Sequence, residues 1–247
     1  MTQTQRKIDV LDKGYVILHD VMGGDLTVAN AARVSYDKKS NELTEGDRRL
    51  IAFLAREGHT SPFRHAFLQL EVYAPLMVAR QHWKYVVGSS IAEATGDNMD
   101  AWNESSRRYI TEEAAFYIPK ADEWRSAPAN SKQGSGGLLS EASGFIFTDE
   151  LEKYIEEGER LYNFAMEHSG ICAEQARLFL PAYGMYVRYY WSASLQSVAH
   201  FLAQRLAHDS QVEIQAYAKA VLELVKPHFP VSIEALTKGA ITSESTN

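Results

Sequence analysis

Residues 67–88 read FLQLEVYAPLMVARQHWKYVVG, and this stretch decides the expected fold. Alternate positions in its first half are apolar, namely Leu68, Leu70 and Val72. Apolar residues at every second position are typical of a half-buried strand. Pro75 suits the first turn of a helix, where the backbone N–H that proline lacks would be unpaired. We therefore expect a strand followed by a helix over residues 75–87, within a mixed α/β domain.

The flanking sequence extends this pattern on both sides. Residues 7–23 predict one or two strands, and helices are expected over 27–36 and 45–57 because apolar residues recur there at helical spacing. From Asp149, where Asp149 and Glu152 have the spacing of a capping box, the chain is expected to be helical to about Lys226. Residues 90–101 and 119–147 are the least regular, and residues 237–247 are expected to be a disordered tail.

The overall composition limits the class of protein. A chain of 247 residues with 45% hydrophobic content fits a single domain over 1–247, with an antiparallel-rich sheet and a mostly helical C-terminal half. The net charge of −7 argues against nucleic acid as a partner. No apolar run is long enough for a membrane, and the polar N-terminus is unlike a secretory signal, so a cytoplasmic location is expected. The single cysteine, Cys172, excludes an intrachain disulfide.

Charged and hydroxyl side chains gather in the segment WNESSRRYI at 102–110, which is unusual in an acidic protein. Two consecutive arginines are often only surface charge. A guanidinium next to serine hydroxyls also matches the oxygens of a phosphate. The candidate anion-binding residues of this segment are Glu104, Ser105, Ser106, Arg107 and Arg108.

Two further arginines, Arg177 and Arg205, stand in apolar surroundings. Each either pairs with a buried carboxylate or converges with the others on one ligand, and the sequence leaves both readings open. The histidines show no metal-binding spacing, so no metal site is predicted.

Seven segments resemble the flavin-dependent thymidylate synthases, in family order and over residues 7–236. They are KIDVLDKGYVILHDVMGGDLTVANAARVSYD, GHTSPFRH, APLMVARQ, WNESSRRY, ARLFLP, RYYW and VEIQAYA. The resemblance implies a homotetramer that methylates C5 of a uracil nucleotide, with methylenetetrahydrofolate as the carbon donor, NADPH as the reductant and FAD as the cofactor. It is consistent with the lack of an activated-thiol setting around Cys172.

Positions carried over from the resemblance define the expected site. Arg205 would be catalytic, placed against the uracil edge to favour negative charge building on the ring. The nucleotide would be bound by Gln81, Lys84, Glu104, Ser105, Ser106, Arg107, Arg108, Arg177 and Arg205. The flavin would be bound by His59, Ser61, Lys84, Tyr85, Val86, Ser89, Glu104, Ser194 and His200.

Several positions depart from the family pattern. The family's Arg-His-Arg is replaced by Lys84, Tyr85 and Val86, about a dozen extra residues precede Trp102, and Ser194 stands where an asparagine is common. These changes resemble a divergent branch that includes the UMP/dUMP methylase of polyoxin antibiotic biosynthesis. The resemblance leads to the hypothesis that UMP is accepted alongside dUMP, and specificity for dUMP alone is the open alternative. The alternative is a flavin-free protein that retains only nucleotide binding.

Overall fold

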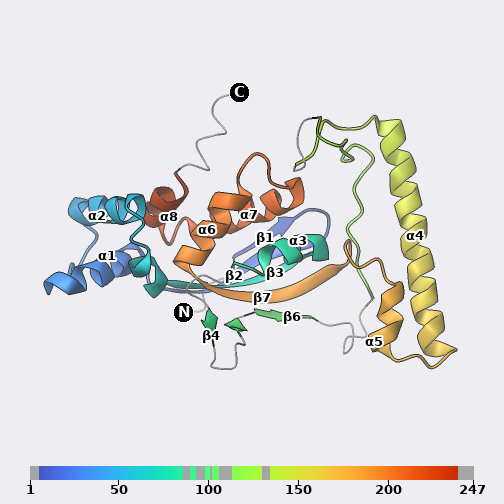
Figure 1. Cartoon of the computed structure of the whole chain (residues 1–247), viewed down its shortest axis with the longest axis horizontal. Coiled ribbons are helices and arrows are strands. Elements are labelled where there is room, and N and C mark those ends of the chain that lie inside the picture. Colours follow the sequence, from blue (N-terminus) through green and yellow to red (C-terminus); the bar gives the residue numbers. More distant parts are fainter. Residues whose placement is uncertain are drawn as a thin grey trace.

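A five-stranded antiparallel sheet forms the centre of the computed structural model (Figure 1). The structure describes residues 6–85, 90–92, 98–100, 102–105, 113–129 and 134–238. The sheet has the order β1-β2-β3-β7-β6. Its strands are β1 (Arg6–Val10), β2 (Gly14–Met22), β3 (Phe67–Pro75), β7 (Tyr186–Ser194) and β6 (Trp102–Glu104). The mixed α/β prediction is confirmed, as are the strands expected over 7–23 and in the first half of 67–88.

The two faces of β3 differ as its sequence pattern predicts, with one exception. Leu68, Leu70 and Val72 are buried in the main hydrophobic core, which includes side chains of α6 (Leu195–Arg205), α7 (Val212–Val225) and α8 (Pro230–Thr237). On the opposite face Glu71 is also buried, because its carboxylate accepts hydrogen bonds from Tyr15 (2.8 Å) and pairs with His19 (2.9 Å). These partners of the two carboxylate oxygens offset the free-energy cost of burying that charge.

The N-terminal helices agree with the prediction, whereas the helix after β3 is shorter than expected. They are α1 (Asp25–Arg33), η1 (Val34–Tyr36), α2 (Glu45–Arg56), η2 (Ser61–His65) and α3 (Leu76–His82). The Tyr85 carbonyl accepts hydrogen bonds from Trp191 Nε1 (3.1 Å) and Ser197 Oγ (2.5 Å). These tertiary contacts hold the backbone at Tyr85. Helix α3 ends at His82, five residues before the predicted end at Val87.

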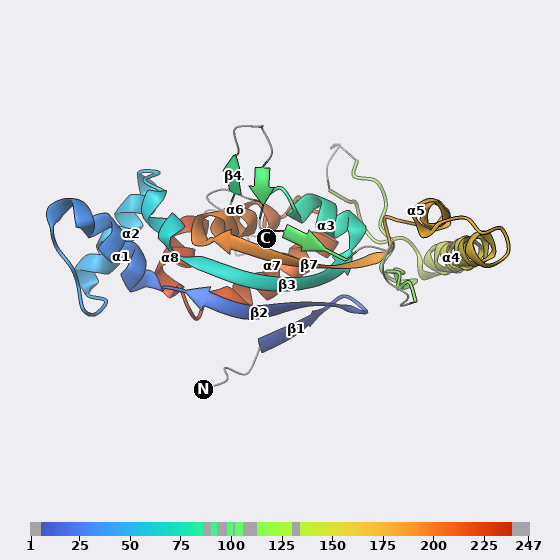
Figure 2. The same cartoon turned by 90° about the horizontal axis from the view of Figure 1, so that it is seen from below.

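The C-terminal half is mostly helical but differs from the prediction at two places. The long helix α4 (Glu141–Glu167) starts at Glu141, capped by Ser140, so the capping box expected at Asp149 and Glu152 is wrong. Strand β7 interrupts the helical region that was expected to run from Asp149 to Lys226. Its aromatic and β-branched sequence YVRYYWSAS favours a strand. The short α5 (Ala173–Ala176) and η3 (Arg177–Phe179) pack on α4, beyond one end of the sheet (Figures 1 and 2).

The two irregular segments contain some local structure. A small hairpin pairs β4 (Ser90–Ala92) with β5 (Asn98–Asp100). In the second segment, Ser126 N donates to Gly137 O (2.9 Å) and Leu139 N to Trp124 O (2.8 Å). The side chain of Trp124 then donates to Thr148 Oγ1 (2.9 Å) on α4. No helix among the described residues is long and apolar enough to cross a membrane.

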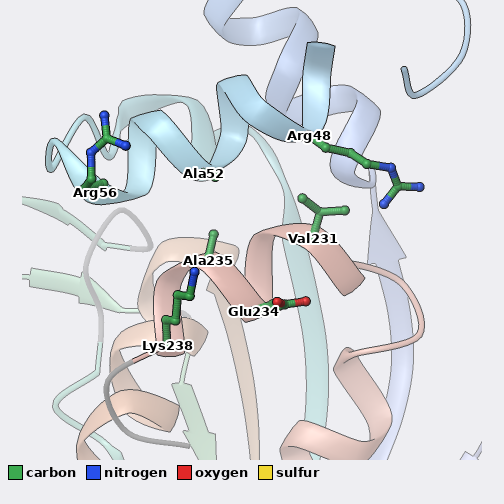
Figure 3. A pocket seen from close by; sticks show the side chains of 7 residues that line it. All are labelled: Arg48, Ala52, Arg56, Val231, Glu234, Ala235 and Lys238. Atoms are coloured by element: carbon green, nitrogen blue, oxygen red, sulfur yellow. The ribbon is translucent and has the colours of Figure 1, made fainter. Parts of the chain in front are cut away.

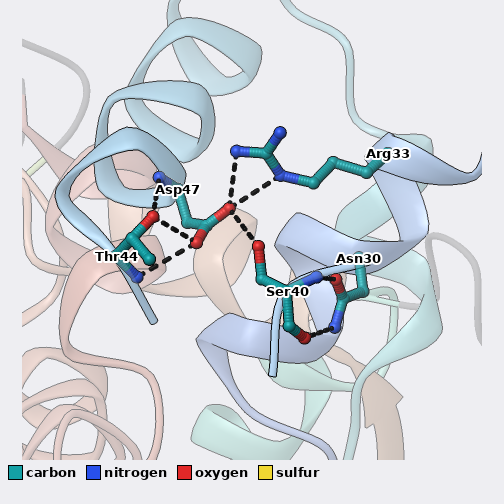
Figure 4. Close-up of polar contacts among 5 residues, drawn as sticks. All are labelled: Asn30, Arg33, Ser40, Thr44 and Asp47. Carbon is teal, nitrogen blue, oxygen red and sulfur yellow. Dashed lines mark hydrogen bonds and ion pairs between the residues drawn. The ribbon is translucent and has the colours of Figure 1, made fainter. Parts of the chain in front are cut away.

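A buried carboxylate joins α1 to α2 (Figure 4). Asp47 Oδ2 accepts hydrogen bonds from the backbone N (3.0 Å) and hydroxyl (2.6 Å) of Thr44, which completes a capping box at the start of α2. Asp47 Oδ1 accepts from Arg33 Nε (2.7 Å) and Ser40 Oγ (3.1 Å). The Thr44 hydrogen bonds, helped by Arg33 and Ser40, outweigh burial and lower the pKa of Asp47 from 3.8 to about 2.

Asp47→Asn is expected to lower the free energy of unfolding by about 2 kcal/mol at neutral pH, since it removes charge-assisted hydrogen bonds. Because the folded-state pKa is lowered, this stabilisation is fully present above pH 3.8 and is lost as the pH falls through about 2. Urea unfolding of both proteins at pH 6 and pH 2.5 measures the difference. A difference that stays constant between these pH values would contradict the assignment.

Candidate functional site

A polar pocket of about 550 Å³ contains two of the predicted site residues, Gln81 and Arg205. Gln81 lies on α3 and Arg205 is the last residue of α6, so residues distant in sequence meet here. The remaining lining residues are Gly134, Gln204, Ala207, Asp209, Ser210 and Gln211. Most of these come from the turn between α6 and α7. The sequence analysis did not select Gly134, Gln204, Ser210 or Gln211, since isolated polar residues in turns carry no distinguishing motif.

The guanidinium of Arg205 is held in the pocket by an aromatic side chain. It lies over the ring of Tyr85, with its Cζ atom 5.6 Å from the ring centroid, a cation–π geometry. The Tyr85 hydroxyl donates to Gln204 Oε1 (2.8 Å), which fixes the ring. Burial, and then the charge of Arg205, lower the pKa of His82 to about 3, so that imidazole stays neutral.

Arg205 retains unused hydrogen-bonding capacity. Its Nε is buried and has no hydrogen-bond partner among the described residues. It also forms no ion pair with any carboxylate that the structure describes, so the reading in which Arg205 pairs with a buried carboxylate is not supported within that part of the chain. A buried N–H without an acceptor is costly. Because Arg205 also lines the pocket, the pocket is suited to a ligand that brings an acceptor oxygen to its guanidinium.

A chain of side-chain hydrogen bonds runs from Gln81 away from the pocket. Gln81 Nε2 donates to Gln211 Oε1 (2.6 Å), and Gln211 Nε2 donates to Glu213 Oε2 (2.8 Å). Glu213 Oε1 in turn accepts from Arg125 Nη2 (2.5 Å). Burial alone would raise the pKa of Glu213, but the hydrogen bonds from Arg125 and Gln211 lower it below its usual value. Arg125 belongs to the segment expected to be irregular, and Gly134 of the same segment lines the pocket.

Glu104 ends the edge strand β6, and Ser105 follows it directly. Ser105 N donates to Arg188 O (2.7 Å), and the Ser105 hydroxyl accepts from Arg188 N (3.0 Å), so Ser105 continues the pairing with β7. Glu104 lines a second pocket of about 220 Å³ with Arg80 and Trp83 of the α3 region. The rest of the segment, Ser106, Arg107 and Arg108, lies outside the described residues.

Arg177 does not share the pocket of Arg205. It lies in η3, which contacts α4 and α5, and its Nε donates to Glu174 O (3.2 Å). Both views place α4 and α5 well away from α6 (Figures 1 and 2). The side chain of Arg177 is exposed. Arg177 and Arg205 therefore do not line the same pocket in the described chain.

The predicted flavin-binding residues lie at several places. Lys84 and His200 are exposed, and the ring centroid of Tyr85 is 5.6 Å from that of His200. His59 and Ser61 are exposed beyond the end of α2. Ser194 is fully buried, and its hydroxyl caps α6 by accepting from Ser197 N (3.2 Å), which is a structural contact. Val86 and Ser89 lie outside the described residues.

A third pocket, about 470 Å³ in volume, lies between α2 and α8 (Figure 3). Its charged residues do not converge, because Arg48 and Arg56 point outward from opposite ends of α2. None of the predicted site residues lines it. Within the part of the chain that the structure describes, no group of three or more His, Cys, Asp or Glu side chains is placed to hold a metal ion.

The fold is shared with a solved nucleotide methylase. The UMP/dUMP methylase PolB from Streptomyces cacaoi, solved with 5-Br dUMP, superposes with a TM-score of 0.76 at 28% identity, covering 94% of this chain and 97% of PolB. The same methylase solved with 5-Br UMP gives a TM-score of 0.74 at 27% identity, covering 94% and 96%.

Sequence comparison identifies the family. The model of the Thy1 family, described as thymidylate synthase complementing protein, matches residues 17–231. The flavin-dependent thymidylate synthase of Thermus thermophilus is 36% identical over 242 residues, covering 96% of this chain and 82% of the relative. That of Thermotoga neapolitana is 35% identical over 234 residues, covering 95% of each. The chain belongs to the flavin-dependent thymidylate synthase family, which confirms the resemblance.

Proposed function

We propose that the protein methylates C5 of a uracil nucleotide, converting dUMP to dTMP and UMP to 5-methyl-UMP. The carbon would come from methylenetetrahydrofolate, and NADPH would reduce bound FAD. The observation that carries the proposal is the pocket shared by Gln81 and Arg205, in a chain of this family. A uracil ring offers carbonyl oxygens for the guanidinium of Arg205 and an N–H for an amide oxygen. The alternative of a flavin-free binding protein is not favoured.

The residues around Tyr85 fit a flavin in their chemistry. Lys84 and His200 are exposed and offer a cation and an imidazole to a pyrophosphate, and these supply part of the charge that the family's Arg-His-Arg would provide. The flavin, when bound, supplies the hydride that reduces the methylene group. The contributions of the chain itself are orientation of the uracil ring by Gln81 and stabilisation by Arg205 of the negative charge that develops on it.

We also propose a homotetramer in which each site is built from more than one subunit. The position of Arg177 beside α4 supports this, because it separates Arg177 from the pocket of Gln81 and Arg205 within one chain. Closed symmetric assembly is the usual way in which such separated surfaces meet.

The acceptance of UMP is supported by the segment that contains Gly134. Gly134 lines the pocket and has no side chain to fill it. PolB, whose fold this chain shares, was solved with brominated forms of both nucleotides. A pocket that accommodates an added ribose hydroxyl needs only space or one hydrogen-bond partner. We also propose that the protein acts in an antibiotic pathway and that it is located in the cytoplasm.

We expect purified protein reconstituted with FAD to absorb near the flavin bands and to form methylated product from both dUMP and UMP. Product formation should require NADPH and methylenetetrahydrofolate together. The measurement is product analysis by chromatography, with reactions lacking FAD as the control. Protein that binds neither flavin nor nucleotide would refute the proposal, and turnover of dUMP alone would restrict it to the deoxynucleotide.

A further inference from the structure

The hydrogen-bond chain behind Gln81 has a fixed direction. A carboxylate only accepts hydrogen bonds, so Glu213 requires Gln211 to turn its Nε2 toward it. Gln211 then presents Oε1 to Gln81, and Gln81 must donate with its own Nε2. A second, longer contact from Gln81 Nε2 to Met77 O (3.3 Å) has the same polarity. The remaining polar atom of Gln81 is its Oε1, a pure acceptor.

The direction of this chain is set by an ion pair outside the pocket. Glu213 is buried (3% exposed), and an isolated carboxylate there would be costly. Arg125 compensates this charge at 2.5 Å and is itself mostly covered, with 23% of its side chain exposed. The backbone hydrogen bonds between 124–126 and 137–139 hold Arg125 in place. Arg125 thus keeps Glu213 ionised and therefore keeps it an acceptor.

We infer that Arg125, Glu213 and Gln211 are positioning residues that make Gln81 present a hydrogen-bond acceptor to the substrate. The inference rests on the proposed function, in which Gln81 contacts a uracil nucleotide. The group recognised is then an N–H or O–H donor of that nucleotide: the imide N3–H of the base or a ribose hydroxyl. A carbonyl oxygen of the base cannot pair with Gln81 in this orientation.

The decisive experiment reverses the ion pair with Arg125→Glu combined with Glu213→Arg. The double variant restores opposite charges, but position 213 now donates, so Gln211 and then Gln81 are expected to turn over and offer Nε2 to the ligand. We expect the single variant Glu213→Arg to lose thermal stability and the double variant to regain much of it. The KM for dUMP and the calorimetric Kd should nevertheless remain raised about tenfold or more, since a donor would face a donor.

A second variant keeps the test valid if the reversed pair does not fold. Gln211→Met leaves Arg125 and Glu213 paired and nearly preserves volume, but it releases Gln81. The KM for dUMP is expected to rise several-fold with kcat little changed. A matched control reverses the exposed pair of α4, with Glu157→Arg and Arg160→Glu, which should alter neither constant.

Nucleotide analogues identify the donor that Gln81 recognises. N3-methyl-dUMP lacks the imide N–H, and 3′-deoxy-UMP lacks one ribose hydroxyl. The analogue without the recognised donor should bind the wild-type holoenzyme and the Gln211→Met variant equally well. A double variant Arg125→Glu/Glu213→Arg with the wild-type KM for dUMP would overturn the inference, whether or not its thermal stability is also recovered. Failure of the wild-type protein to bind dUMP or UMP would instead overturn the proposed function, and the role of the chain with it.

Discussion

Arg205→Ala is expected to reduce kcat about 30- to 1,000-fold, corresponding to about 2–4 kcal/mol of barrier. The reason is that Arg205 lines the pocket with its guanidinium held over Tyr85, so its charge would face the ring on which electron density builds. That density is present mainly in the transition state, and the Kd for dUMP should change much less than kcat. Single-turnover measurements on the reconstituted enzyme separate the two quantities.

Two further variants test this role of Arg205. Arg205→Lys keeps a positive charge but not the planar donor, and it should retain more activity than Arg205→Ala. Arg160→Ala removes an exposed arginine of α4 and should leave kcat unchanged. Equal losses in kcat and in dUMP affinity for Arg205→Ala would mean that the side chain only binds the nucleotide.

Mixing two inactive variants should restore activity if the sites are shared between subunits. Arg177→Ala and Arg205→Ala are each expected to lose most turnover. The two variants are unfolded together in equal amounts and then reassembled. If each site takes Arg177 from one chain and Arg205 from another, about a quarter of the sites would contain both intact arginines. The measurement is specific activity of the mixture against each variant treated alone.

The matched control uses two residues that line one pocket of a single chain. A mixture of Gln81→Ala and Arg205→Ala should show no recovery, because no subunit then carries both intact residues. Recovery in this control, or none in the mixture with Arg177→Ala, would contradict the shared site.

The sequence predicted most secondary structure because local patterns determine it. The alternation of Leu68, Leu70 and Val72 identified β3, and its buried face follows that alternation. Strand β7 was missed because helical periodicity on both sides outweighed the strand preference of its aromatic residues, whereas in the structure it pairs with β3 and β6. The early end of α3 was also missed, because it depends on contacts of Tyr85 with Trp191 and Ser197, which are distant in sequence.

The candidate site was predictable in part. Gln81 and Arg205 were selected through the resemblance, and the structure brings them into one pocket. Gln211 and Arg125 were not selected, since their importance lies in the direction of hydrogen bonds between three separated segments. The separation of Arg177 from Arg205 was not visible either, because sequence order does not indicate which end of a fold a residue occupies.

The ion pair between Arg125 and Glu213 has a consequence for protein engineering. A loop exchange that replaces residues 119–139 by a segment with no arginine at the position of Arg125 leaves Glu213 buried in α7 without its cation. Such a chimera would be destabilised for a reason unrelated to substrate choice. Residues 119–139 and 211–213 should therefore be transplanted together, as one exchangeable unit, when substrate range is to be altered by grafting.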